Sequence, residues 1–235
     1  MPRRIEDFRG LTQISRVRLL HAVQRVPGRR LQELADAAGI HINTARDHLR
    51  VLEDEGLIVS APEATGTRGR PPTVYTPVTA VSENPAARKR AEQAQDLGDK
   101  LRKFAPDLAK HGDLCGEALH QIDTLYSHLE DVGLEPDLDE DALTIDLEPC
   151  PFASMIESER NVVCSVHATL VQHHLAQVPG PLRLGKLSPF ITSNVCQIAL
   201  RHKKTTGLMP TRRPPDAADD PEPPTVAEAG FPPAQ

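Results

Sequence analysis

The N-terminal architecture follows from Leu-Ala-Asp-Ala-Ala-Gly-Ile at residues 34–40 and Asn-Thr-Ala-Arg-Asp-His-Leu at residues 43–49. Apolar residues recur here at helical spacing, which predicts one helix over residues 30–38 and a second over residues 43–55. Gly39 stands where the chain must change direction, and the small side chain of Ala35 allows the two helices to approach closely. We therefore expect a helix-turn-helix.

The flanking segments extend this unit on both sides. A helix is predicted over residues 14–26, and Gly56 follows the second helix of the pair as a C-terminal cap. Strands at residues 57–59 and 73–76 enclose a loop over residues 63–72 that is rich in Gly, Pro and Arg. The order of helix, helix-turn-helix and two-stranded hairpin is that of a winged helix, whose second motif helix enters the major groove of double-stranded DNA.

Polar residues at the start of that helix and at the hairpin tip are the candidate DNA contacts. Asn can form two hydrogen bonds with adenine and Arg two with guanine, while basic residues on a tip can reach phosphates. The candidates are Asn43, Thr44, Arg46, Asp47, His48 and Arg50 on the helix, with Arg68 and Arg70 on the tip. The alternative is a three-helix core whose polar face contacts only water.

The composition is that of a soluble globular protein. The chain has 235 residues, a formal net charge of -6, no Trp and only 3% aromatic residues, which argues against a stacking platform for single-stranded nucleic acid. Ten Arg against five acidic residues within residues 1–50 still give the first part a basic excess suited to phosphate. No membrane span or signal peptide is expected, so we expect a cytoplasmic protein. The absence of CxxC, GxSxG, HExxH and a glycine-rich phosphate loop argues against an enzyme.

The middle of the chain is predicted to be a helical dimerisation region over residues 84–132. Its second helix is expected over residues 113–132, with Cys115 in the core. The first helix has apolar residues near coiled-coil spacing, and Pro106 is expected to end it. This stripe consists of Ala87, Ala91, Ala94, Leu97, Leu101, Phe104 and Leu108. A homodimer suits DNA with two half-sites, whereas the alternative is packing within one subunit.

Three cysteines gather in the region that follows. Cys150 comes after a predicted strand over residues 142–147, Cys164 lies in the expected first turn of a helix starting at Asn161, and Cys196 lies in a strand. A helix N-terminus favours a thiolate, so the sequence predicts that Cys164 is easily deprotonated.

Thiolates at the ends of three elements suit an iron–sulfur cluster or zinc, although zinc sites usually use closer cysteine pairs. His167, Cys115, a small ligand or water remain open as the fourth ligand. The simpler interpretation is that the cysteines are small core residues.

The winged-helix segments, together with Gly-Arg-Pro-Pro-Thr-Val-Tyr at residues 69–75, resemble the ArsR-like transcriptional regulators. Glu-Pro-Cys-Pro-Phe at residues 148–152, Val-Cys-Ser-Val-His at residues 163–167 and then Cys196 resemble the subgroup that contains the Suf-operon repressor. This resemblance implies a homodimer with a cluster, of the 4Fe-4S type, on three cysteines that controls operator binding. His41 departs from the family, where Ser or Thr often caps the recognition helix.

These observations together predict an α+β chain. We expect a winged helix-turn-helix DNA-binding domain over residues 1–80 and the helical dimerisation region over residues 84–132. A small cysteine-containing α+β sensing domain should follow over residues 133–206, and a disordered Pro-rich tail over residues 207–235. The expected function is that of a transcriptional regulator, a repressor, with a cluster as cofactor. The alternative is a regulator with structural zinc or a small-molecule effector.

Overall fold

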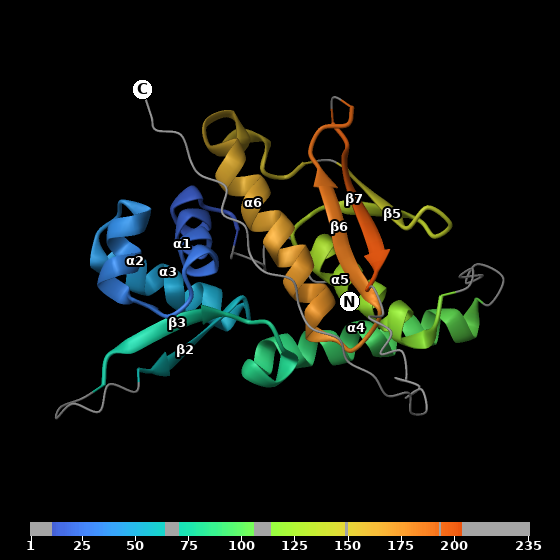
Figure 1. Cartoon of the computed structure of the whole chain (residues 1–235), viewed down its shortest axis with the longest axis horizontal. Helices are drawn as coiled ribbons and strands as arrows, with labels where there is room; N and C mark the ends of the chain where they lie inside the picture. Colours follow the sequence, from blue (N-terminus) through green and yellow to red (C-terminus); the bar gives the residue numbers. More distant parts are fainter. Residues whose placement is uncertain (1–10, 64–70, 106–113, 149, 193, 204–235) are drawn as a thin grey trace, which may run out of the picture. The chain divides into compact units, whose positions relative to one another are not determined.

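The first part of the chain is a winged helix in the computed structural model, which describes residues 11–63, 71–105, 114–148, 150–192 and 194–203 (Figure 1). Its elements are α1 (Ile14–Arg25), β1 (Arg29–Arg30), α2 (Leu31–Ala38), α3 (Ile42–Asp54), β2 (Ile58–Pro62) and β3 (Thr73–Pro77). The strands form an antiparallel sheet in the order β1-β3-β2. The three predicted helices and both predicted strands are confirmed, and β1 was missed because it has only two residues. The predicted tail lies outside the described residues.

The turn between α2 and α3 forms as the sequence predicts. Gly39 has a φ of 65°, a left-handed conformation that glycine adopts without strain. Its N–H donates to the Asp36 carbonyl, and the Ile40 N–H donates to the Ala35 carbonyl, so the last carbonyls of α2 are satisfied. Ala35 is buried, which confirms its predicted position at the close approach.

The second part of the chain combines helices with an antiparallel sheet. After a short 3-10 helix, η2 (Val81–Glu83), its elements are α4 (Pro85–Phe104), α5 (Gly116–Asp131), β4 (Glu135–Asp139), β5 (Thr144–Glu148), α6 (Ala153–Gln177), β6 (Leu182–Ser188) and β7 (Cys196–His202). The sheet order is β4-β5-β7-β6. Sequence reasoning missed β4, an acidic strand at the sheet edge that contains Pro136, and β6, which Gly185 interrupts near an irregularity in the register.

The α6 helix differs from its prediction at the N-terminal end. It begins at Ala153 rather than at Asn161, and Glu159 interrupts it with a non-helical φ of -134° and ψ of 33°. Because Glu159 is non-helical, the part of α6 that carries Cys164 begins at about residue 160, close to the predicted start at Asn161, and Cys164 lies just after its first turn.

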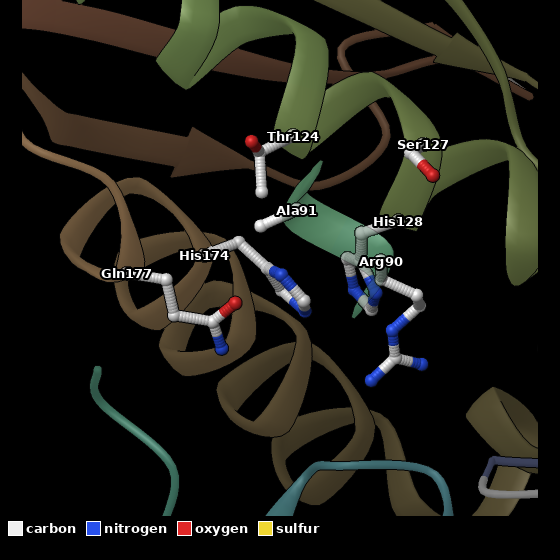
Figure 2. A pocket seen from close by; sticks show the side chains of 7 residues that line it. All are labelled: Arg90, Ala91, Thr124, Ser127, His128, His174 and Gln177. Atoms are coloured by element: carbon white, nitrogen blue, oxygen red, sulfur yellow. The ribbon is translucent and has the colours of Figure 1, made fainter. Parts of the chain in front are cut away.

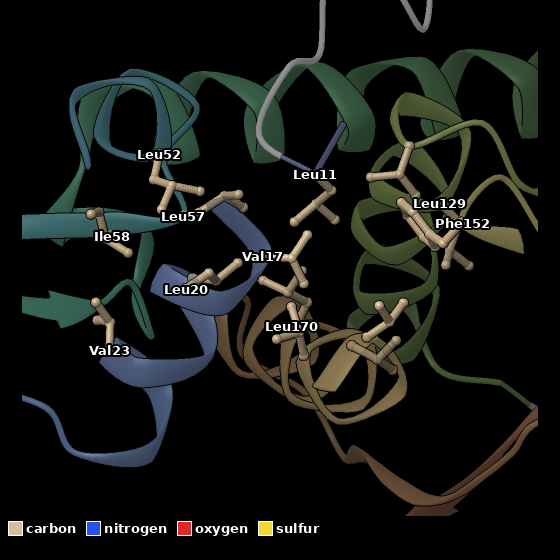
Figure 3. Close-up of a cluster of buried hydrophobic side chains, with 14 of the residues drawn as sticks. Leu11, Val17, Leu20, Val23, Leu52, Leu57, Ile58, Leu129, Phe152 and Leu170 are labelled. Carbon is tan, nitrogen blue, oxygen red and sulfur yellow. The ribbon is translucent and has the colours of Figure 1, made fainter. Parts of the chain in front are cut away.

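A hydrophobic core joins the two parts of the chain. The α1 helix contributes Val17 and Leu20, which lie near Leu170 of α6 in Figure 3, and α1 also packs against α2 and α3. Because each fully buried Leu or Val side chain contributes about 1.5–3 kcal/mol, this contact ties α1 to both parts of the chain.

The predicted stripe on the first helix of the middle region divides into two surfaces. Ala87, Ala91 and Ala94 are buried within the subunit, together with Gly98. The later residues Leu97, Leu101 and Phe104 are 56%, 60% and 83% exposed. The expectation of one continuous seam is thus wrong, because the alanine half already packs inside its own chain. Leu108 and Pro106 lie outside the described residues.

An ion pair joins α4 to α5. Arg102 donates to both carboxylate oxygens of Asp123, at 2.9 and 2.7 Å, and these side chains are only 18% and 12% exposed. A Cβ atom on Gly98 would lie 2.3 Å from the Asp123 carboxylate. Glycine at this position therefore makes room for the ion pair.

We expect Gly98→Ala to lower the free energy of unfolding by about 1–3 kcal/mol, although alanine is intrinsically the better helix former by about 1 kcal/mol. The added methyl group must displace Asp123 from Arg102. Urea denaturation measures the change, and Gly116→Ala serves as control because a Cβ there meets nothing within 4 Å. An increase in stability for Gly98→Ala would contradict this account.

Candidate functional site: the recognition surface and the thiol cluster

The α3 helix presents the predicted DNA contacts on its outer side. It buries Ala45, Leu49 and Leu52, which leaves the residues between them on the opposite face. Of the predicted contacts, Asn43, Thr44, Asp47 and Arg50 are exposed, and Arg46 and His48 are half-buried. The hairpin-tip candidates Arg68 and Arg70 lie outside the described residues. The hairpin closes below them, where the Glu63 N–H donates to the Pro72 carbonyl at 2.8 Å.

Side chains along α3 are pre-positioned by short-range contacts. Arg46 donates to Asn43 Oδ1 at 2.7 Å, and Arg50 lies 3.6 Å from Asp47 in a well-exposed pair. Exposed pairs of this kind contribute about 0–1 kcal/mol, so DNA can displace them at little cost. The N-cap is His41, whose Nδ1 accepts from the Asn43 N–H at 3.2 Å. His41 thus caps the helix in place of the Ser or Thr that is common in the resembling family.

His48 links α3 to α1 as well as facing outward. Its Nε2 and Ser15 Oγ are hydrogen-bonded at 2.9 Å. Burial and the charge of Arg16 lower the pKa of His48, and Asp47 opposes this shift only in part. Nothing in the sequence indicated this contact, because Ser15 lies on α1 and His48 lies on α3, two helices later in the chain.

The three cysteines of the second part come from three elements, and Cys150, Cys164 and Cys196 together are called the thiol cluster here as a name for the set, not for a formed metal site. Cys150 follows β5, Cys196 begins β7 opposite Leu147 of β5, and Cys164 lies on α6. All three are half-buried. Burial raises the pKa of both Cys150 and Cys164, and the charge of Cys196 raises each further. The thiols therefore act on one another electrostatically.

Burial is the main reason why the pKa of Cys164 lies above its usual value, and the nearby Arg160 charge only partly opposes it. The prediction of an easily deprotonated Cys164 is thus wrong for the protein as it stands. Among the described residues, no three His, Cys, Asp or Glu side chains are arranged to hold a metal ion. The cysteines would have to move to share one.

Two residues missed by the sequence analysis adjoin the thiol cluster. Phe190 has a φ of 54°, which is strained for a bulky residue, and its N–H donates to Cys196 Sγ at 3.5 Å. The Arg160 guanidinium lies 4.9 Å from the Phe190 ring centroid. Strained residues concentrate at functional sites, so this geometry is consistent with a binding role for the neighbouring thiols.

The remaining metal candidates lie elsewhere. Cys115 is exposed at the N-cap of α5, so its predicted core position is wrong. His167 is buried with its ring edge against Phe152, at a centroid distance of 6.3 Å. The charge of His167 lowers the pKa of His128 and His174, and burial lowers its own pKa.

Two of the buried histidines, His128 and His174, border a small pocket between α4, α5 and α6. The rings of His128 and His174 stack with centroids 3.9 Å apart and an interplanar angle of 20°. Burial lowers the pKa of His167 to about 4 and that of His174 to about 3, and the pKa of His128 is also well below its usual value. Figure 2 shows the lining residues, which are Arg90, Ala91, Thr124, Ser127, His128, His174 and Gln177.

Comparison with known proteins identifies the first part of the chain. A family described as a helix-turn-helix domain matches residues 13–61, which contain all three helices of the winged helix. No curated protein and no solved structure matches the chain. The match supports a DNA-binding transcriptional regulator and ends well before the thiol cluster. No described helix is long and apolar enough to span a membrane.

Proposed function

We propose that the protein is a homodimeric transcriptional repressor whose affinity for double-stranded DNA is controlled by an iron–sulfur cluster on Cys150, Cys164 and Cys196. The observation that carries this proposal is that three half-buried cysteines whose charges act on one another occur in the same chain as a helix-turn-helix domain. The protein would act by occupying DNA rather than by catalysis.

The chemistry of the thiol cluster suits the proposed cofactor. Thiolates are the preferred ligands of iron–sulfur clusters, and hydrogen bonds to their sulfur atoms tune the reduction potential. The Phe190 N–H already donates to Cys196, and a backbone hydrogen bond from Phe152 acts on Cys150. Because the pKa values of Cys150 and Cys164 are raised, binding iron would release their protons, so loading should weaken at low pH. When bound, the cluster would supply sensitivity to oxidants and to iron supply.

The dimer is supported by the exposed half of α4. Leu97, Leu101 and Phe104 recur at spacings of four and three residues, so they form one stripe on the helix surface. Large exposed apolar side chains in a contiguous stripe are typical of an interface. A second copy of the chain is the occupant that also provides two recognition helices for half-sites about 34–36 Å apart.

We expect anaerobically purified protein to contain iron and sulfide, and each of Cys150→Ala, Cys164→Ala and Cys196→Ala to lose both. Cys115→Ala is the matched control, because this thiol is exposed on another element. Iron and sulfide analysis with visible absorption gives the measurement. Retention of iron in all three single variants would refute the ligand set.

The same experiment distinguishes the cluster from the second candidate function, a regulator with structural zinc or a small-molecule effector. A colourless, zinc-containing preparation would favour a structural zinc site on the same thiols. A metal-free protein would favour a small-molecule effector.

Arg46→Ala is expected to relax base preference by about 1–3 kcal/mol at one position of the site, because Arg46 lies near the start of α3. Arg70→Ala should instead weaken binding uniformly across sequences. Both effects can be read from the affinities of a panel of single-base variants of a duplex selected by the wild-type protein from a random pool. An equal loss on every duplex for both substitutions would contradict this division.

A further inference from the structure

The β3 strand carries Tyr75, a residue that the candidate DNA contacts do not include. This strand is the central one of the β1-β3-β2 sheet, and Tyr75 lies opposite Arg29 of β1 and opposite Ser60 of β2. The Gly28 N–H also donates to the Tyr75 carbonyl at 2.9 Å. The backbone of Tyr75 is therefore held by a neighbouring strand on each side.

The Tyr75 side chain lies on the face of the sheet that is turned toward the recognition helix. Residues directly opposite each other in an antiparallel pair place their side chains on one face, so Tyr75 shares its face with Ser60. The Ser60 N–H and hydroxyl both donate to the carboxylate of Glu53, at 3.0 and 2.7 Å. Glu53 belongs to the last turn of α3, which packs against β2 (Figure 1). Tyr75 consequently lies beside the end of α3.

Along this face, the sheet emerges from the core toward the hairpin tip. Ile58 is fully buried, Tyr75 is half-buried and Thr73 is exposed. The Tyr75 ring packs against the hydrophobic core. Its hydroxyl reaches solvent and has no hydrogen-bond partner in the part of the chain that the structure describes. Tyr75 thus combines an anchored ring with a polar end that is available for a ligand.

The charged side of α3 surrounds this polar end. Arg46, Arg50 and Glu53 follow one another at spacings of four and three residues, so they form one stripe on the helix. Burial and the charge of Glu53 raise the pKa of Tyr75, and both arginines oppose that rise. The phenol is therefore protonated at neutral pH, and it can donate a hydrogen bond beside two cations that attract phosphate.

We propose that Tyr75 is a further DNA-contacting residue, whose hydroxyl donates a hydrogen bond to a phosphate next to the bases that α3 contacts. Tyrosine is among the side chains that bind DNA phosphates, and such contacts position a protein on the duplex without reading its sequence. The fixed ring would set the distance between α3 and the DNA backbone. This inference rests on the DNA-binding part of the proposed function, and it involves neither the thiol cluster nor the dimer.

The test is Tyr75→Phe, which removes the hydroxyl and keeps the ring that packs against the core. We expect binding to weaken about tenfold on every member of the panel of single-base variants, because a hydrogen bond to a charged group is lost. The salt dependence of the affinity should not change, because a neutral donor releases no counterions. Tyr126→Phe is the matched control, since the second of the two tyrosines lies on α5 with its oxygen hydrogen-bonded to the Leu138 backbone.

A second measurement identifies the phosphate. Duplexes that carry one neutral methylphosphonate at a time are titrated with wild type and with Tyr75→Phe. At one position, the methylphosphonate should cost the variant at least about fivefold less affinity than it costs the wild type, because the two changes remove the same contact.

Three outcomes would overturn this inference while DNA binding stands. They are an affinity of Tyr75→Phe within about twofold of the wild type, a loss confined to particular base pairs, and the absence of any phosphate at which the two changes are coupled. Wild-type protein that selects no duplex from the random pool would refute the proposed function, and the inference would fail with it.

Discussion

Lowering the pH to about 5.5 is expected to reduce the free energy of unfolding by about 4 kcal/mol relative to neutral pH. His128, His167 and His174 are buried with lowered pKa values, so they stay neutral in the folded protein at this pH. In the unfolded chain they take up protons below about pH 6.5. Stability is therefore complete above that pH and is lost as the pH falls toward the folded pKa values. Each histidine costs about 1.4 kcal/mol at one pH unit below 6.5, and the total protein stability is typically only about 5–15 kcal/mol.

Urea denaturation of the cluster-free protein at several pH values measures this effect. His167→Gln should remove about one third of the pH dependence, whatever it does to stability at neutral pH, because the slope counts protons. His202→Asn is the matched control, since His202 is exposed at the end of β7. A stability that does not change between neutral pH and about pH 5.5 would show that the three histidines are not buried as described.

Substituting Leu101→Glu together with Phe104→Glu should convert the proposed dimer to a monomer, with at least a 100-fold increase in its dissociation constant. Buried apolar anchors at interfaces commonly contribute about 2 kcal/mol or more each, and a tenfold change in affinity corresponds to about 1.4 kcal/mol. Each subunit should still fold, because both side chains are exposed in the single chain. Sedimentation measures the association, and circular dichroism confirms the fold.

Lys103→Glu changes the charge of the same helical turn without removing an apolar group, so it should leave the dimer intact. The monomeric variant should also lose affinity for a two-half-site duplex while retaining weak binding to one half-site. A double variant that remains dimeric would locate the interface elsewhere.

The winged helix could be predicted because its signals are local. Gly39 requires a left-handed conformation, and the apolar spacing of α3 marks its buried side without reference to distant residues. The stripe on α4 shows the limit of this approach. The period of its apolar residues correctly identified a packing face. The period alone does not show what packs against that face, and Ala87 and Ala91 pack within the subunit.

The surroundings of the thiol cluster could not be predicted, because they depend on contacts between distant segments. Phe190 reaches Cys196 only after β6 and β7 have paired, and the sequence analysis did not recognise β6. The ion pair between Arg18 and Glu159 joins residues 141 positions apart. The predicted core position of Cys115 was wrong for a local reason. The α5 helix begins at Gly116, so the side chain of Cys115 lies just before the helix and is exposed.

The length of α6 has a mechanical consequence. The segment from the Glu159 kink to Gln177 spans about 27 Å at a rise of about 1.5 Å per residue. Gln177 and His174 line the same pocket as Arg90 and Ala91 of α4. If the segment tilted as a rigid rod about Glu159, a tilt of about 5° would displace its far end by roughly 2 Å, given that rise per residue. That displacement would reach α4, which carries the exposed side chains of Leu101 and Phe104.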